Sequence, residues 1–376
     1  MSGHVRQRGK KGQWYGIIDV RDPATGKRKG RRWHKLENCS GKREAEKACE
    51  RLIAQQVDGT YVDRSKMNVA EFVTERINQW EAAGDISART AQRYRQLAEN
   101  QIEPHLGAKP LQKISRLDIE AWHTVLRNGG LAARTIGHAH RVLGKALRDA
   151  EKDNLVVRNA CKLQRAPKVP EEEMVIVRDV PALMDKLMGF RLRVPALVAL
   201  FTGMRLGEIL ALRLNRTHLE RGVIEVREAL EQTKAHGIRF KAAKTKAGRR
   251  DITLPDILVA ALREHRKAML ELRMQLGAGR LPDDALLFAD IDGRPLPPNA
   301  QSAAWADFAE NIDMPDVTFH ALRHTHASQL IDAGVDIVTI SKRLGHSKPD
   351  ITLRIYAHLF RNDDSKAAAA INAAFR

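Results

Sequence analysis

The stretch HALRHTHAS at residues 320–328 gathers three histidines and one arginine within seven residues. His320 and His324 have the i, i+4 spacing that lets two imidazoles on one helix face bind zinc. However, no glutamate follows His320 to activate a water molecule, and Arg323 would repel a dication from the same face. The planar guanidinium of Arg323 instead matches phosphate oxygens, and His320 can bind the same group or move a proton. The stretch therefore favours a phosphate site, and we expect neither a metal nor a cofactor.

Cleavage of a phosphodiester without metal needs cations around the nonbridging oxygens, a nucleophile, and an acid for the leaving alkoxide. Three other stretches supply candidates for these roles: TGMRLGEILALR at 202–213, KTKAGRRDITL at 244–254 and LGHSKPDITLRIYAH at 344–358. The candidate side chains in them are Arg205, Lys244, Lys246, His346 and Tyr356.

These stretches resemble the motifs of the tyrosine recombinases, also called phage integrases. The family has an arginine in TG-x-R-x-x-E, a lysine in a β-hairpin, H-x-x-R, a Gly-His pair, and a tyrosine shortly after that pair. This chain has all five in order, and the match spans about 175–360. The matching residues are Thr202-Gly203-Met204-Arg205 with Glu208, Lys244 or Lys246, His320 with Arg323, Gly345-His346, and Tyr356.

The resemblance implies that Tyr356 attacks the scissile phosphorus and forms a 3′-phosphotyrosine. A free 5′-hydroxyl of the partner DNA then attacks this intermediate, so that no ATP is needed. One hairpin lysine would protonate the 5′-oxygen, and His320 would help to accept the tyrosine proton. Lys244 is followed by threonine, as in several family members, which favours it, but Lys246 remains a competitor.

The resemblance also implies that Arg205, Arg323 and His346 hold the nonbridging oxygens in the transition state. Glu208, one turn after Arg205, would orient that arginine. The remaining histidines of these stretches match no catalytic position of the family, and we expect structural roles for them: His324, His326 and His358.

The elements that must position these residues are mostly helical. Helices are predicted at 178–188, 194–202, 206–214, 255–274, 299–310, 318–334 and 336–345, and strands of one small antiparallel sheet at 223–228, 238–240 and 250–254. Upstream, apolar spacing predicts helices at 87–102, 115–128 and 131–152, with Ser87 and Ser115 as N-caps.

The first 65 residues have a different character. QWYGIIDV and RKGRRWHKL read as paired strands around the turn DPATGK, and a helix follows at 42–56. Sixteen Lys and Arg residues lie in this segment against eight Asp and Glu. We expect a small basic DNA-binding module here.

The expected fold class is mainly α with small antiparallel β-sheets (α+β), in several domains. The resemblance implies a tyrosine recombinase catalytic fold, preceded by a helical core-binding (SAM-like) domain and a small N-terminal arm-type domain of sheet and helix. The expected boundaries are 1–65 for the arm-type domain, 66–165 for the core-binding domain, 166–174 for a linker and 175–376 for the catalytic domain.

Composition limits the partners. The net charge is +18 and the pI is about 10.0, which predicts a polyanionic partner, nucleic acid before acidic lipid. No apolar run reaches the length of a membrane span and the start lacks a signal peptide, so we expect a protein of the bacterial cytoplasm, associated with the nucleoid. The three cysteines form no CxxC pair, as expected of reduced thiols.

These observations favour a site-specific recombinase that integrates or excises a phage or another mobile element. Its partners would be double-stranded DNA attachment sites, three further copies in a homotetramer, and DNA-bending or directionality factors. The alanine-rich tail SKAAAAINAAFR would dock on a neighbouring protomer. The alternatives are a DNA-binding regulator or architectural protein on the same fold, a DNA-relaxing enzyme of the type IB topoisomerase kind, and a metal-dependent nuclease using His320 and His324.

Overall fold

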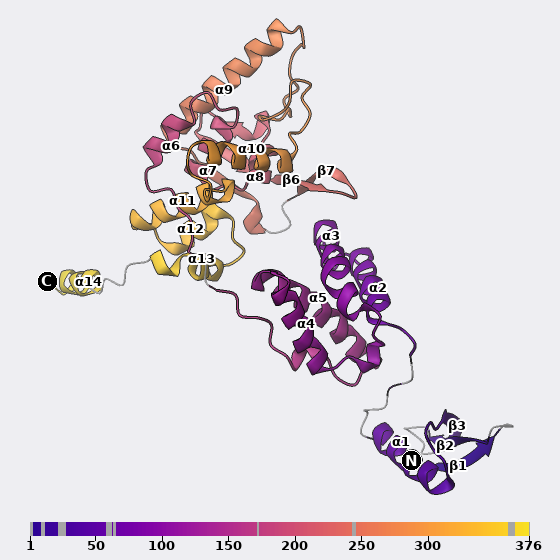
Figure 1. The fold of residues 1–376 in the computed structure, drawn as a ribbon. Coiled ribbons are helices and arrows are strands. Elements are labelled where there is room, and N and C mark those ends of the chain that lie inside the picture. The colour runs from indigo at the N-terminus through magenta and orange to yellow at the C-terminus, as the bar shows by residue number, and fades with distance from the viewer. Residues whose placement is uncertain are drawn as a thin grey trace. The chain divides into compact units, whose positions relative to one another are not determined.

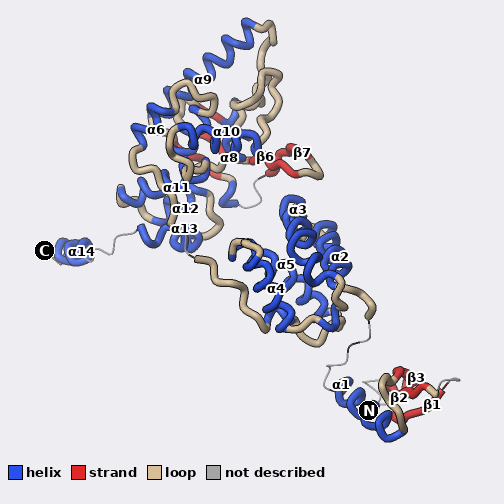
Figure 2. The backbone as a smooth tube through the Cα atoms, viewed as in Figure 1, coloured by secondary structure: helices blue, strands red, loops and turns tan. Residues whose placement is uncertain are grey.

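The computed structural model describes residues 3–8, 12–21, 28–57, 62, 65–170, 173–242, 246–359 and 365–375. The chain forms two compact units, 1–170 and 171–376, each with its own apolar cores (Figure 1). Helices predominate in both units, and strands are confined to small antiparallel sheets (Figure 2). The predicted fold class is confirmed.

The first unit begins with a three-stranded antiparallel sheet in the order β1-β2-β3: β1 Gly3–Arg8, β2 Gln13–Arg21 and β3 Arg28–Lys35. The pairing of β2 with β3 matches the predicted hairpin, but β1 was not predicted, and the predicted turn lies outside the described residues. Helix α1 (Lys42–Val57) contributes Ala45 and Cys49 to a small core with Leu36.

The rest of this unit is helical. Its elements are α2 Val69–Ala82, α3 Ala88–Leu97, a π-helix Ala98–Gly107 that contains Pro104, a 3₁₀ turn Leu111–Lys113, α4 Arg116–Asn128, α5 Ala133–Lys152 and a 3₁₀ turn Ala160–Lys162. Both predicted N-caps are confirmed, since Ser87 Oγ accepts from the Thr90 N–H and Ser115 Oγ from the Asp118 N–H. Helix α2 was not predicted.

The second unit starts with helices α6 Val180–Lys186, α7 Arg193–Thr202 and α8 Leu206–Leu210. A sheet in the order β4-β5-β8 follows, from β4 Thr217–His218, β5 Val223–Val226 and β8 Arg250–Thr253. Strands β6 Glu228–Thr233 and β7 Gly237–Ala242 form a separate hairpin. The prediction of one sheet is therefore wrong. The strand read at 238–240 pairs with a segment that the sequence pattern did not mark, and not with 223–228.

The unit continues with α9 Asp256–Gln275, α10 Pro298–Asn311, α11 Phe319–Asp332, α12 Ile337–Leu344, α13 Pro349–Tyr356, a 3₁₀ turn Ala357–Leu359 and α14 Ser365–Ala374. Helix α7, RVPALVALFT, is almost wholly apolar because it lies inside the unit, where α11 packs against it. None of the described helices is both long and apolar enough to cross a bilayer.

Candidate active site

Two glycines bring separate parts of the chain to one place. Gly203 ends α7 and Gly345 ends α12, both in the left-handed conformation, with φ of 68° and 71°. A Cβ on Gly203 would lie 2.6 Å from Leu344 and 2.7 Å from His326, so no larger residue fits there. The turn after Gly203 places Arg205 at the start of α8, and the turn after Gly345 places His346 beyond α12.

Arg323 joins these two turns from α11. Its side chain is almost fully buried, with 2% of its surface exposed. Nη1 donates to the carbonyl of Gly203 at 2.5 Å, and Nη2 donates to Nε2 of His346 at 2.8 Å. Because a guanidinium can only donate, Nε2 of His346 accepts, and its Nδ1–H donates to Thr352 Oγ1 at 2.7 Å. The tautomer of His346 is thereby fixed.

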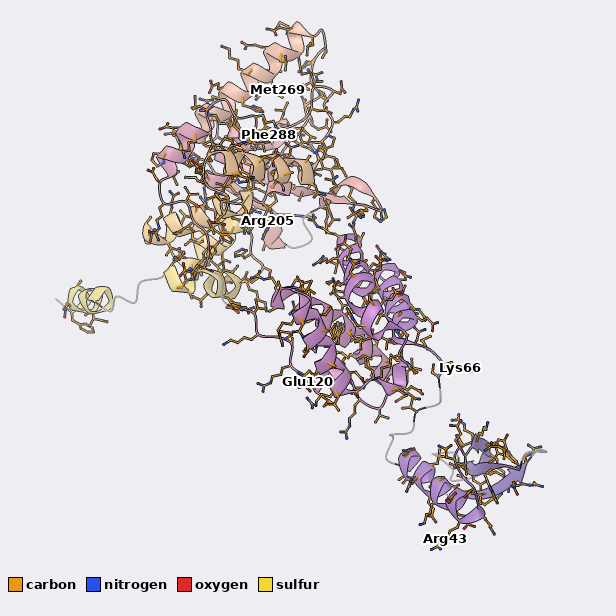
Figure 3. All side chains as sticks on the ribbon, viewed as in Figure 1. Arg43, Lys66, Glu120, Arg205, Met269 and Phe288 are labelled. Carbon is orange, nitrogen blue, oxygen red and sulfur yellow. The ribbon has the colours of Figure 1, made fainter. Side chains whose placement is uncertain are left out.

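Four of the predicted side chains line one open cavity of about 620 Å³: Arg205, His320, Arg323 and His346. They come from the start of α8, from α11 and from the turn after α12, and Arg205 is labelled in Figure 3. The side chain of Arg205 is 44% exposed and can reach a ligand in the cavity. Two guanidinium groups facing one open space make a site for an anion.

The carboxylate next to Arg205 already has hydrogen-bond partners. Glu208 accepts from Arg205 Nη1 at 3.0 Å, and from Arg250 Nη2 at 2.9 Å and Nη1 at 3.3 Å. Burial raises the pKa of this carboxyl, but hydrogen bonds and charge from Arg250, with the charge of Arg205, lower the pKa to about 2. Glu208 is therefore ionised and fixed, as expected of a residue that orients Arg205.

Burial and neighbouring charges shift the pKa values of the arginine and histidine side chains in the site. Burial, followed by the charge of Arg205, lowers the pKa of Arg323 to about 9, which leaves it protonated at neutral pH. Burial and the neighbouring arginines lower the pKa of His346 to about 4 and also lower that of His320. Both imidazoles are thus neutral in the free protein. A bound phosphate would offset the arginine charges and raise both pKa values.

Tyr356, the last residue of α13, is held inside the protein. It is 1% exposed, and its hydroxyl hydrogen-bonds with Nδ1 of His324 at 2.9 Å. The ring of His324 in turn lies edge-on to that of His320, with centroids 4.7 Å apart. Burial raises the pKa of Tyr356 to about 12 and lowers that of His324 to about 4, so that the phenol is the donor in this hydrogen bond.

The other residues of these motifs fall into three groups. Lys244 lies outside the described residues, and only the backbone of Lys246 is described, so the choice between the two lysines stays open. His326 is buried between the Leu200 carbonyl and Arg343 Nε, which is the structural role expected of it. His358 is exposed, so that the expected structural role has no packing to support it.

Sequence reasoning missed two residues. The contact of His324 with Tyr356 follows from the packing of α11 and α13 and has no signal in the spacing. Arg250 did have a signal in the sequence. Side chains of the strand RDIT on β8 alternate between the two faces of the sheet, which puts Arg250 on the inward face with Ile252. A charged side chain at an inward strand position needs a buried partner, and that partner is Glu208.

A second cavity, of about 350 Å³, has a different lining. Its walls are mainly apolar and include Met269 and Phe288, which are labelled in Figure 3. None of the predicted site residues whose side chains the structure describes lines it. Among the described residues, no group of three or more His, Cys, Asp or Glu side chains could hold a metal ion.

Comparison with known families gives two matches. The model of the phage integrase family matches residues 175–363, which is half of the chain, and the model of the phage integrase N-terminal SAM-like domain matches residues 72–126. Among curated proteins, the XerC-like tyrosine recombinase of Caldanaerobacter subterraneus is 26% identical over 280 residues, covering 70% of this chain and 72% of its own. An integrase of Streptomyces ambofaciens is 25% identical over 358 residues, covering 92% and 90%.

Solved structures share the fold. The Tn1549 transposon integrase, solved in complex with circular intermediate DNA, has a TM-score of 0.70 at 21% identity, covering 82% of this chain and 99% of its own. The lambda integrase, solved as a tetramer bound to a Holliday junction, has a TM-score of 0.57 at 17% identity, covering 96% and 97%. The chain belongs to the phage integrase family, and it is a tyrosine site-specific recombinase.

Proposed function

We propose that this protein cuts and rejoins double-stranded DNA at attachment sites through a 3′-phosphotyrosine and so integrates or excises a phage or another mobile element. The observation that carries the proposal is the convergence of Arg205, His320, Arg323 and His346 on one cavity, while His324 of α11 holds the hydroxyl of Tyr356, which ends α13. Preorganised donors at a site of developing negative charge are the main source of catalysis in reactions of this kind.

In the cleavage step, the phenolic oxygen of Tyr356 forms a bond to phosphorus as the bond from phosphorus to the 5′-oxygen breaks. The phenolic proton passes to His320, and Lys244 or Lys246 gives a proton to the departing 5′-oxygen. Because the phosphodiester is exchanged for a phosphotyrosine ester and is not hydrolysed, a 5′-hydroxyl of a new strand can reverse the step. Tyr356 is 1% exposed, so its hydroxyl has to leave His324 before it attacks.

The nonbridging oxygens are held by Arg205, Arg323 and His346. Arg205 is the more exposed of the two arginines, whereas Arg323 is held in place by the Gly203 carbonyl. His346 gains a proton as the phosphate enters, because the added negative charge offsets the neighbouring guanidinium groups. Because two donors cannot share a hydrogen bond, the protonated Nε2 then turns from Arg323 Nη2 to the phosphate, and Nη2 is released to bind the same oxygens.

The test is covalent trapping on a nicked suicide attachment site. The unaltered protein is expected to form a protein–DNA adduct, also in excess EDTA, because no metal takes part. Tyr356→Phe is expected to bind the same DNA and form no adduct. An adduct with Tyr356→Phe would contradict the assigned nucleophile, and loss of the adduct in EDTA would favour a metal-dependent nuclease.

Partners follow from the same proposal. The solved Tn1549 integrase carries DNA and the solved lambda integrase is a tetramer on a Holliday junction. We expect this chain to assemble likewise as a homotetramer on two attachment sites, with DNA-bending or directionality factors. It would act on the nucleoid in the cytoplasm of a bacterial host. Exchange of strands between two sites, and not relaxation of one, distinguishes this activity from that of a type IB topoisomerase.

A further inference from the structure

Arg250 is a buried arginine that the proposed chemistry does not use. It opens β8, directly after the segment with the two candidate lysines, and only 7% of its side chain is exposed. Its nitrogens already donate to protein oxygens, so it is not itself a ligand of the phosphate. A buried guanidinium is costly unless it is paired, which makes its partners informative.

The guanidinium of Arg250 joins three segments. Nη1 and Nη2 donate to the two carboxylate oxygens of Glu208 on α8, and Nε donates to the Arg343 carbonyl at the end of α12, at 2.7 Å. Nη1 also lies 3.4 Å from the carbonyl of Gly248, in the lysine segment itself. Each of these three segments carries a side chain assigned above to the scissile phosphate or its leaving group.

The fit around this guanidinium is close. A Cβ on Gly345 would lie 2.7 Å from Nη1 and 2.9 Å from Cζ of Arg250. Gly345 therefore serves two purposes: it adopts the left-handed conformation that ends α12, and it leaves room for Arg250 beneath the turn that carries His346. The position of the His346 turn thus depends on Arg250.

Charge sharing at Glu208 gives Arg250 a more specific role. The buried carboxylate has two cationic partners, Arg250 from inside and Arg205 from the cavity side. With Arg250 present, the negative charge is neutralised from within, and Arg205 keeps an exposed side chain that can bind an anion. Without Arg250, Glu208 would retain Arg205 as its ion-pair partner and draw this guanidinium away from the phosphate.

We propose that Arg250 is a positioning residue of the cleavage reaction. It neutralises most of the charge of Glu208, so that Arg205 keeps only a single side-chain bond to this carboxylate and its exposed side chain can bind the scissile phosphate, and it holds the His346 turn and the backbone turn Lys246–Gly248 in place. This inference rests on the proposed function. It assigns a role to a residue that acts through Glu208 and not through contact with DNA.

A double-variant cycle tests the proposal. The full chain is compared with Arg250→Gln, Glu208→Gln and the double variant, at a temperature at which thermal unfolding shows each to be folded. The measured quantities are the rate of adduct formation on the nicked suicide site and the affinity for the same DNA. Arg250→Gln is expected to lower the adduct rate about 100-fold, as loss of a transition-state donor does, with the affinity changed by only a few-fold.

The decisive comparison is the double variant. If Arg205 is captured by an unneutralised Glu208, then removing the carboxylate as well releases it, and the double variant should be about tenfold faster than Arg250→Gln. A double variant that is equal to or slower than Arg250→Gln overturns the proposal, as does an Arg250→Gln protein with the rate of the unaltered protein. If Arg250→Gln does not fold, the adduct rate of the double variant should lie within about tenfold of the rate of Glu208→Gln alone. A larger loss of rate overturns the proposal.

Two further arms complete the experiment. The neighbouring Arg249 is exposed and provides a matched control: Arg249→Gln removes the same charge, and its effect should be the same with and without Glu208→Gln. Arg250→Lys keeps the charge but loses the paired hydrogen bonds and should be partly active. Absence of any adduct with the unaltered protein would contradict the proposed function, a result distinct from failure of the cycle.

Discussion

The three histidines of α11 differ in what each one contacts. His320 lines the cavity, His324 holds the Tyr356 hydroxyl, and His326 lies between a backbone carbonyl and Arg343. His324 follows His320 by four residues and precedes His326 by two on the same helix, yet each ring has different neighbours. The hydrogen-bond partners, and not the residue type, decide what each imidazole can do.

His326 gives a prediction at this scale. Its Nδ1–H donates to the Leu200 carbonyl and its Nε2 accepts from Arg343, so a proton on Nε2 would face a guanidinium. Burial, then Arg343, lowers the pKa of His326 to about 4. Because the unfolded chain binds this proton more readily, the free energy of unfolding should fall as the pH falls from about 6.5 to about 4, by about 3 kcal/mol from this group.

The check is a set of denaturant unfolding curves at pH values across that window. His326→Gln offers a donor and an acceptor but no titration, and it should show a shallower loss of stability with falling pH than the unaltered protein. Parallel pH profiles for the two proteins would contradict the assignment.

At the scale of elements, helix ends build the site. Helices α7 and α12 each stop at a glycine, and the turns that follow carry Arg205 and His346. Helix α11 lies between them, and Arg323 bonds to both turns. The glycines of the TG and GH motifs are thus part of the geometry, because a left-handed residue is what reverses the chain at these points.

A pair of glycine substitutions tests this reading. Gly345→Ala combines a φ of 71° with overlap on Arg250, and should lower the free energy of unfolding by more than about 2 kcal/mol and abolish the adduct. Gly334→Ala is the matched control, because φ is 76° but no atom lies within 4 Å of the added methyl group. Gly334→Ala should lower the free energy of unfolding by about 1 kcal/mol and leave adduct formation unchanged. Equal effects of the two substitutions would show that Arg250 does not need this space.

At the scale of the whole molecule, the strongly basic balance suits a protein that acts on DNA, and we expect the C-terminal helix to link copies. Helix α14 has ten residues, and Ile371 and Phe375 are 60% and 85% exposed. An isolated helix of this length is marginal in water, and these two apolar side chains are exposed in the part of the chain that the structure describes. Docking on a neighbouring protomer would supply that cover.

Truncation after residue 362 should therefore weaken tetramer formation on paired attachment sites, measured by gel filtration of the protein–DNA complex. The double substitution Ile371→Ala with Phe375→Ala should have the same effect, whereas Asn372→Ala, on the same helix, should not. An unchanged tetramer in the truncated protein would contradict docking of α14 on a neighbouring protomer.

Much of this could be predicted from the sequence. Residues that are close along the chain and spaced by three or four positions share a helix face, so His320 and Arg323 could be placed together from their spacing. The N-caps marked where helices begin, the glycines marked where helices end, and the motif order indicated the family. Local backbone geometry fixes the shared helix faces and the helix ends, and it is encoded within a few residues.

Only the tertiary structure decided which distant groups meet. Arg323 bonds to a carbonyl 120 positions away, and Arg250 to a carboxylate 42 positions and a carbonyl 93 positions away. The partner of a buried charge depends on how helices and strands pack, and spacing along the chain does not carry that information. For the same reason, the strand partner of β7 and the hydrogen bond from Tyr356 to His324 were not predicted. The sequence determined the chemistry available, and packing decided which groups face the cavity and which stand behind them.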